Sequence, residues 1–334
     1  MSKEHSAVLT CVGAVIGAGF ASGREVVTFF TQYGRHGWWL IVLASLLMAG
    51  LCALCMQAAG TGGPDWIRLI HGGRAAQLCP LLLMTLTAGA MISASGHMVA
   101  LAWSHPWAYE LGVLGTLLAS WQMAHGRLKM LNVLSGALTL MLLCILMASL
   151  GRLPAETVVR TQPHSLTGLA AAAVRVAGYA AMNMTLAIGV VCQSAQRTDS
   201  HRVTAGLFGW MIGMLLLISH CVYSRDPSSG GMVFPMLSLL KAYGRAGYAA
   251  GVALLYLAIV TTLTSVLYAL RSASESRIAR RELRWLLVPG IPLAVSGVGF
   301  ESIVDRLYAP AGLICLAAVF APMALRLWKR TTFP

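Results

Sequence analysis

The sequence predicts an all-helical integral membrane protein, and its composition and the length of its apolar runs both support this fold class. Of the 334 residues, 57% are hydrophobic and only 10% are charged, and the mean hydropathy is +0.73. A soluble domain carries about 25% charged residues. Apolar runs close to the roughly 20 residues that cross a bilayer recur along the whole chain. These runs leave no room for a soluble domain.

About ten spans are predicted in chain order. We expect them at about 7–33, 38–59, 78–102, 108–124, 130–150 and 167–192, then a seventh ending near 222, one at 247–270, a ninth ending near 300, and a last at 307–328. Segments 60–76 and 223–245 are interrupted by glycine, proline and charged residues. Interruptions of this kind are typical of loops, so both segments are expected outside the membrane, each with a surface helix.

The chain is expected to form one membrane domain, 1–334, made of two halves at about 7–150 and 167–328. The polar stretch 151–165 separates five predicted spans from five others. An odd number of spans in each half gives the halves opposite orientations, which is the inverted repeat of many secondary transporters. Most of the 24 basic residues fall on one side of this arrangement. The positive-inside rule then predicts both termini in the cytoplasm.

The first span contains a glycine-rich stretch that weakens its middle. Gly17, Gly19 and Gly23 each lower helix stability by about 1 kcal/mol relative to alanine. Irregular backbone at membrane depth is tolerated only where protein buries it or where it lines a cavity. We therefore predict a break and a solute site between Gly17 and Gly23. Close helix packing through small residues is the alternative interpretation.

The corresponding helix of the second half, the sixth span, also carries glycine in its middle. Gly178, Tyr179 and Asn183 follow one another in an otherwise alanine-rich and methionine-rich segment. An inverted repeat would place a second break here, at about 178–183. The alternative is an ordinary packing helix in which Asn183 bonds a neighbour.

The eighth span presents a row of hydroxyl groups. Thr261, Thr264 and Ser265 share one helix face by their spacing. Oxygen ligands of this kind suit hard cations, and carbonyl groups freed by a broken first helix could complete a cation site. The alternative is that each hydroxyl bonds a carbonyl of its own helix, which is common in membrane helices.

The run from Gly13 to Glu25 resembles the opening signature of the YkvI-like bacterial membrane proteins, and the ten-span length fits that family over the whole chain. These proteins are similar to the amino acid-polyamine-organocation superfamily, so the resemblance implies the LeuT fold with broken first and sixth helices. It also implies a Na+ site formed by the carbonyls of Gly13 and Ile16 and by Thr261, Thr264 and Ser265. A second Na+ site would need a polar residue at Phe20 and is not expected.

A small set of residues is expected to contact the solute or to control access to it. The candidate solute contacts surround the two predicted breaks: Gly17, Ala18, Gly19, Phe20, Gly23, Ser93, Tyr179 and Asn183. Three charged or titratable residues near or inside spans, Arg24, Glu25 and His97, are candidates for a gate or a proton-linked group, because ionisable groups at membrane depth are costly.

These observations predict a secondary transporter of a small amino-acid-like solute, either an amino acid or a related amine, coupled to Na+. A proton-coupled transporter, or an uncoupled exchanger, facilitator or sensor, is the alternative. No catalytic motif appears in any span, so we expect no enzyme activity. We expect no cofactor or metal beyond Na+. The expected location is the bacterial cytoplasmic membrane, with the lipid bilayer as partner and no nucleic-acid partner.

Overall fold

The computed structural model describes residues 3–63, 65–70, 73–125, 129–152, 166–275 and 277–332, and these are helical without any strand. The N-terminal helix consists of three pieces: α1 (Lys3–Val15), α2 (Ala18–Ser22) and α3 (Arg24–Phe29). The long helices that follow are α4 (Gly37–Gly62), α6 (Gly73–Ala102), α7 (Ala108–Met123), α8 (Lys129–Leu150), α9 (Leu166–Ala195), α10 (His201–Arg225), α12 (Gly244–Glu275) and α13 (Arg281–Ser296).

Short helices connect these elements and form the C-terminal part. The connecting helices are η1 (Thr31–His36), α5 (Trp66–Leu69), η2 (Pro227–Gly231) and α11 (Pro235–Lys241). The last stretch runs without interruption through α14 (Phe300–Ser302), η3 (Ile303–Leu307), α15 (Tyr308–Cys315), η4 (Leu316–Phe320) and α16 (Ala321–Thr332). Both interrupted segments, 60–76 and 223–245, therefore carry short helices, as expected.

Six described helices are long and apolar enough to cross a membrane, which confirms a multi-span membrane protein. They are Thr31–Gly62, Gly73–Ala102, Thr167–Ala195, His201–Arg225, Gly244–Glu275 and Phe300–Lys329. The remaining predicted spans coincide with the interrupted α1 to α3 and with α7, α8 and α13. Most of the connection expected between the two halves, residues 153–165, lies outside the described residues.

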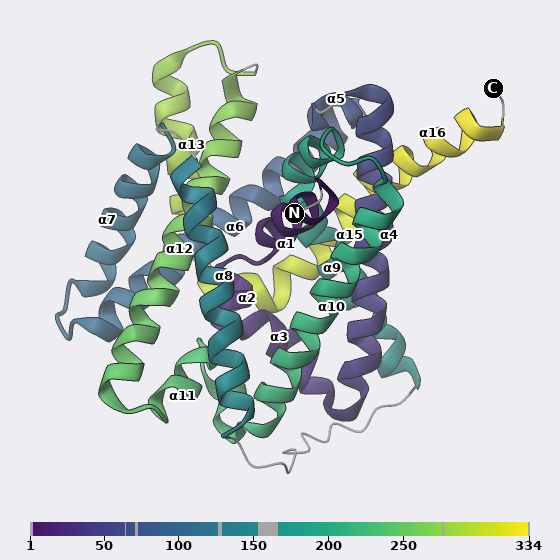
Figure 1. Ribbon diagram of the computed structural model, residues 1–334. Coiled ribbons are helices and arrows are strands. Elements are labelled where there is room, and N and C mark those ends of the chain that lie inside the picture. Colours follow the sequence, from purple (N-terminus) through teal and green to yellow (C-terminus); the bar gives the residue numbers. More distant parts are fainter. Residues whose placement is uncertain are drawn as a thin grey trace.

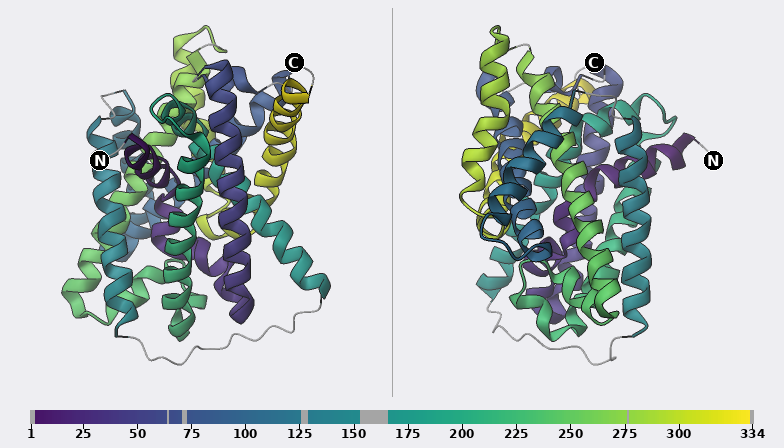
Figure 2. Two further views of the ribbon diagram at one scale, coloured as in Figure 1. Left: turned by 45° about the vertical axis from the view of Figure 1, so that its right-hand side comes forward. Right: turned by 90° about the vertical axis from the view of Figure 1, so that its left-hand side faces the viewer.

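The helices form a bundle with the broken N-terminal helix inside it. Figure 1 shows α1, α2 and α3 following one another down the middle of the molecule, between α9 and α10 on one side and α12 on the other. The C-terminus and the turn between α12 and α13 lie at one end, and α11 lies at the opposite end. In the right-hand view of Figure 2, α1 projects sideways from the bundle toward the N-terminus.

The predicted break in the first helix is present, and the predicted break in the sixth is wrong. The first helix ends at Val15, resumes at Ala18 and changes direction again at Gly23. In contrast, α9 is one unbroken helix of 30 residues that runs through Gly178 and Asn183.

Gly178 of α9 serves helix packing. A Cβ atom added to Gly178 would collide with the backbone carbonyl of Ala309 in α15, and one added to Gly312 would collide with the carbonyl of Gly178. The two backbones therefore approach each other through small residues, which is how membrane helices commonly associate. The structural requirement for Gly178 is this close approach to α15.

Candidate functional site

The first break in the N-terminal helix is held by a side chain of α12. Gly17 is extended, with φ −98° and ψ −170°, so the next amide, that of Ala18, has no partner inside its own helix. The Ala18 N–H donates to the hydroxyl of Thr262 at 3.0 Å. A buried amide without a partner is costly, and this contact removes that cost. Thr262 therefore joins α12 to the break in the first helix.

The second break depends on a left-handed glycine. Gly23 has φ 80°, a region that side-chain-bearing residues rarely adopt. A Cβ atom there would also lie 2.5 Å from Cζ of Tyr223 in α10. The neighbouring Ser22 hydroxyl donates to the Gly19 carbonyl at 2.7 Å and accepts from the Arg24 N–H at 3.1 Å. Ser22 thus satisfies backbone groups that the break exposes.

Between the two breaks, the space beside Gly19 is occupied by the carboxyl group of Glu25. A Cβ atom on Gly19 would collide with Oε1 of Glu25 and lie 2.7 Å from its Cδ. Glu25 is 6% exposed and is hydrogen-bonded to the side chain of Tyr179. Tyr179 is buried, and its ring packs against that of Phe29 in a tilted arrangement at a centroid distance of 4.7 Å. The structure thus brings three of the candidate residues, Gly19, Glu25 and Tyr179, into one cluster.

One end of this cluster is closed by ion pairs of Arg24. Its guanidinium group pairs with Asp305 in η3, with 3.2 Å between Nε and Oδ1, and with Glu301 at 3.0 Å. The same group donates to the carbonyl of Met232 at 3.0 Å. The Arg24 side chain is 13% exposed, whereas those of Asp305 and Glu301 are 31% and 46% exposed. The pair with Asp305 is therefore the more shielded of the two.

Two further residues converge on Asp305. The Thr28 hydroxyl donates to its Oδ1 at 2.8 Å, and Arg175 of α9 donates to its backbone carbonyl at 3.1 Å. Asp305 therefore links α3, α9 and the C-terminal helical stretch. These contacts lie at the α3 end of the broken helix, which is the end nearer α11 (Figure 1).

The hydroxyl groups predicted for the cation site each donate a hydrogen bond to a backbone carbonyl of their own helix, α12. Thr261 donates to the carbonyl of Ala258 at 2.9 Å, Thr264 to that of Val260 at 2.7 Å, and Ser265 to that of Thr261 at 2.9 Å. Each hydroxyl oxygen keeps lone pairs for a further contact. Thr264 is buried and Ser265 is exposed.

The other part of the predicted cation site, on α1, has free space beside its backbone. A Cβ atom on Gly13 would meet nothing within 4 Å. Ile16 is 8% exposed and directly precedes the extended Gly17. The five residues predicted for the Na+ site therefore lie on α1, at the break and on α12, on the far side of the break from Arg24.

The remaining predicted residues lie around the cluster. Phe20 and Ala18 are buried within α2. Asn183 is buried and donates to the Tyr179 carbonyl in its own helix at 3.1 Å. Ser93 accepts from the Phe300 N–H at 3.2 Å and lies 3.2 Å from the Tyr109 hydroxyl, so its hydroxyl serves the start of α14.

His97 lies away from the break. Its imidazole is exposed and meets the ring of Tyr109 edge-on at 5.1 Å between centroids. The carboxylate of Glu301 is close enough to act on it electrostatically. His97 therefore neighbours the ion-pair end of the site.

Sequence reasoning missed Thr262 and Asp305. Thr262 belongs to the recognised hydroxyl run but not to the face that the spacing grouped. Asp305 falls between the predicted ninth and tenth spans, whereas the last helical stretch already begins at Phe300. The available signal was an acidic pair, Glu301 and Asp305, spaced one helical turn apart near a membrane boundary, together with a buried arginine in need of a partner.

A known protein is similar in sequence to this chain. No protein-family model matches the sequence. The uncharacterized membrane protein YkvI of Bacillus subtilis is 23% identical, and the alignment covers 96% of this chain and 95% of that protein. The chain is thus similar to YkvI over nearly the whole length of both proteins. The resemblance to the YkvI-like proteins is thereby confirmed over nearly the whole length of this chain.

The chain also resembles a solved structure in its fold. The crystal structure of the Eremococcus coleocola manganese transporter, in complex with an aromatic bis-isothiourea substituted compound, matches with a TM-score of 0.51 and 17% sequence identity. The match covers 96% of this chain and 78% of that one. At this identity the likeness shows a shared fold, in agreement with the LeuT-type fold that the sequence resemblance implied.

Proposed function

We propose that this protein is a secondary active transporter of a small amino-acid-like solute, which binds at the broken N-terminal helix. The observation that carries the proposal is the buried cluster in which Glu25 of α3 and Tyr179 of α9 meet beside Gly19, which lies between the two helix breaks. Broken helices that line a polar site near the middle of the membrane are characteristic of transporters. The shared fold with a manganese transporter supports the same class of function.

The proposed mechanism is alternating access in a ten-span, five-plus-five inverted repeat with both termini in the cytoplasm. In this orientation, the ion pairs of Arg24 form the outer gate, which is closed. The region around Gly13 and the exposed Ser265 lies toward the cytoplasm. The positive-inside rule supports the orientation, because Arg271, Arg281 and Arg284 lie at the C-terminal end of α12 and the start of α13.

The chemistry of the cluster suits an amine-bearing solute. Glu25 has no ion-pair partner among the described residues, although it is 6% exposed. A buried carboxylate is strongly stabilised by a cation, and an ammonium group of an amino acid or amine provides one. The absence of a side chain on Gly19 lets this carboxyl group lie directly against the backbone of α2. The site is therefore proposed for a small solute.

Manganese is less favoured as the solute, although the structural neighbour is a manganese transporter. No group of three or more His, Cys, Asp or Glu side chains that could hold a metal ion occurs in the part of the chain that the structure describes. The cluster beside the break contributes one carboxyl group, that of Glu25. The carboxylates of Glu301 and Asp305 are already paired with Arg24. This donor set suits an ammonium group better than a divalent cation.

We propose Na+ as the coupling ion, bound by Thr264, Ser265 and the carbonyls near the break. We expect Thr264→Ala and Ser265→Ala each to raise the Na+ concentration for half-maximal uptake about tenfold, which corresponds to about 1.4 kcal/mol. Each change removes one oxygen from a shell that needs several. The measurement is uptake of a mixture of labelled amino acids and putrescine into proteoliposomes, as a function of Na+ at constant pH.

Ser219→Ala is the matched control for these variants. Ser219 is buried in α10 and donates to the carbonyl four residues earlier at 2.8 Å, as Thr264 and Ser265 do. Its removal should leave the Na+ dependence unchanged. If uptake by the parent protein ignores Na+ but follows a proton gradient, the Na+ site is rejected. Coupling would then be assigned to Glu25, and Glu25→Gln should abolish the pH dependence.

A further inference from the structure

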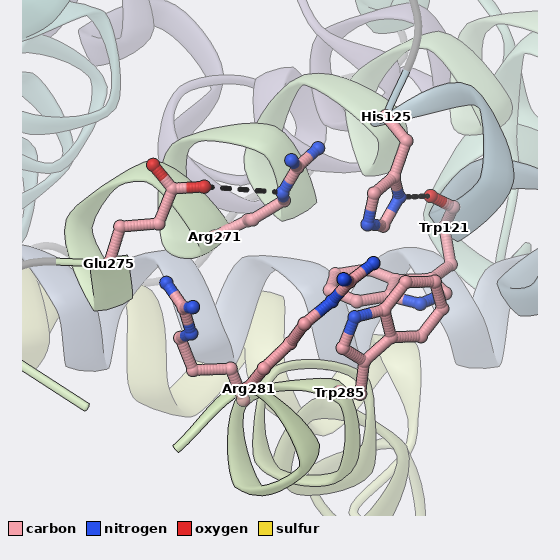
Figure 3. A pocket seen from close by; sticks show the side chains of 7 residues that line it. Trp121, His125, Arg271, Glu275, Arg281 and Trp285 are labelled. Atoms are coloured by element: carbon pink, nitrogen blue, oxygen red, sulfur yellow. Dashed lines mark hydrogen bonds and ion pairs between the residues drawn. The ribbon is translucent and has the colours of Figure 1, made fainter. Parts of the chain in front are cut away.

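A pocket lined by aromatic rings lies at the end of the molecule that carries the turn between α12 and α13. Trp285, at the start of α13, stacks on His125 at 4.7 Å between ring centroids and meets Trp121 edge-on at 5.4 Å. His125 follows the end of α7, and its Nδ1 lies 2.8 Å from the Trp121 carbonyl oxygen. Figure 3 shows the three rings together at one side of the pocket. The pocket has a volume of about 120 Å³.

The charge of this pocket is mostly positive. Arg271, Arg281 and Arg284 line it together with a single carboxylate, Glu275. Arg271 already pairs with Glu275 at 3.5 Å and donates to the Ala124 carbonyl at 3.2 Å. Across the described residues, neither Arg281 nor Arg284 has a side-chain hydrogen bond or ion pair. Two guanidinium groups are therefore left for an anion.

An unpaired donor also lies in the wall of the pocket. Trp121 is 7% exposed, and its indole N–H has no hydrogen-bond partner among the described residues. Buried polar groups normally have a partner, so an unpaired N–H in a residue that lines the same pocket as two free guanidinium groups indicates a missing acceptor. Guanidinium groups bind phosphate oxygens in paired hydrogen bonds.

The surroundings favour a phosphate that is attached to a lipid. A second, open hollow shares Arg281 and Trp285 with the pocket and is also lined by Glu282 and Leu286. Leu286 is 69% exposed and Trp285 is 45% exposed. An exposed leucine beside an exposed tryptophan is typical of the membrane interface, where an acyl chain would lie. The pocket and the hollow together match a headgroup and a chain.

We propose that this pocket binds the phosphate headgroup of an acidic phospholipid of the inner leaflet, held by Arg281, Arg284 and the Trp121 N–H. The acyl chain lies along Trp285 and Leu286. The side of the membrane follows from the orientation proposed above, while the pocket itself is independent of the transported solute. Basic pockets between membrane helices on the cytoplasmic side are suited to anionic headgroups.

The test is lipid binding to the purified full-length protein by native mass spectrometry, with phosphatidylglycerol and phosphatidylcholine compared at equal concentration. We expect phosphatidylglycerol to be retained in preference, and the double variant Arg281→Gln/Arg284→Gln to lower its affinity at least about tenfold, because each charge-assisted hydrogen bond is roughly twice as strong as a neutral one. The control is Arg197→Gln/Arg202→Gln, which removes two exposed arginines from the same predicted side of the membrane.

Three results would overturn the proposal. Because phosphatidylcholine also carries a phosphate, equal retention of both lipids would show that the pocket does not select an acidic headgroup. Equal losses in the pocket variant and the control variant would show a general charge effect. Displacement of phosphatidylglycerol by millimolar inorganic phosphate, with the phosphate itself bound through Arg281 and Arg284, would assign the pocket to a free anion. An unchanged elution volume and thermal transition of the variant establish that the loss of binding is not unfolding.

Discussion

Replacement of Gly19 by leucine is expected to reduce solute uptake to the level of empty liposomes. Even the Cβ atom of the new side chain would collide with Oε1 of Glu25, so the carboxyl group must leave its place beside the helix break and beside Tyr179. Membrane insertion should be retained, because leucine raises the hydropathy of the span. The measurement is uptake by proteoliposomes containing equal amounts of parent and variant protein.

Gly50→Leu is the control for this substitution. Gly50 lies in α4, is exposed, and would place a Cβ atom within 4 Å of nothing. It therefore adds the same side chain to a membrane helix without touching the site, and uptake should stay at the parent level. Normal uptake by Gly19→Leu would show that Gly19 serves helix packing alone.

The second large effect is expected from Arg24→Gln, which removes the guanidinium group from the proposed outer gate. We expect a cysteine introduced at the buried Val27 to react about tenfold faster with a membrane-impermeant maleimide added outside. Hydrogen bonds to charged groups contribute roughly 1.5–3 kcal/mol to the stability of the state that contains them. The partial exposure of Asp305 lowers this contribution, so we expect the closed state to lose stability equivalent to about a factor of ten. The reference is the same protein without the introduced cysteine, because the chain has eight of its own.

Glu301→Gln separates the two ion pairs of Arg24. Its carboxylate is 46% exposed, whereas Asp305 is 31% exposed and also accepts from Thr28. We therefore expect Glu301→Gln to change the labelling rate much less than Arg24→Gln or Asp305→Asn. A labelling rate at Val27 that is the same in Arg24→Gln as in the parent protein would contradict the gate.

The break in the first helix could be predicted because its cause is local. Three glycines within seven residues weaken any helix, and Gly23 has the positive φ that only glycine adopts readily. The sixth helix shows the limit of this reasoning. Gly178 looks the same in sequence, but its role depends on how closely the backbone of α15 approaches. That distance is a property of the packed bundle.

The hydroxyl face of α12 illustrates a similar limit. Helical spacing groups Thr261, Thr264 and Ser265, but it does not say which face of α12 meets α2. The contact to the break is made by Thr262, which the grouping left out. Likewise, the importance of Asp305 follows from the helical turn η3, which carries the residue into contact with Arg24. Both residues became visible only when the helices were placed in space.

The most direct test of the central claim is solute accumulation in proteoliposomes loaded with a known internal buffer. A labelled mixture of amino acids and putrescine would be added under an inward Na+ gradient, an inward proton gradient, or neither, with Gly19→Leu as reference. The proposed function predicts accumulation above the external concentration under the Na+ gradient, and none without a gradient or in Gly19→Leu. Uptake by the parent protein that equals that of Gly19→Leu under all three conditions would contradict it.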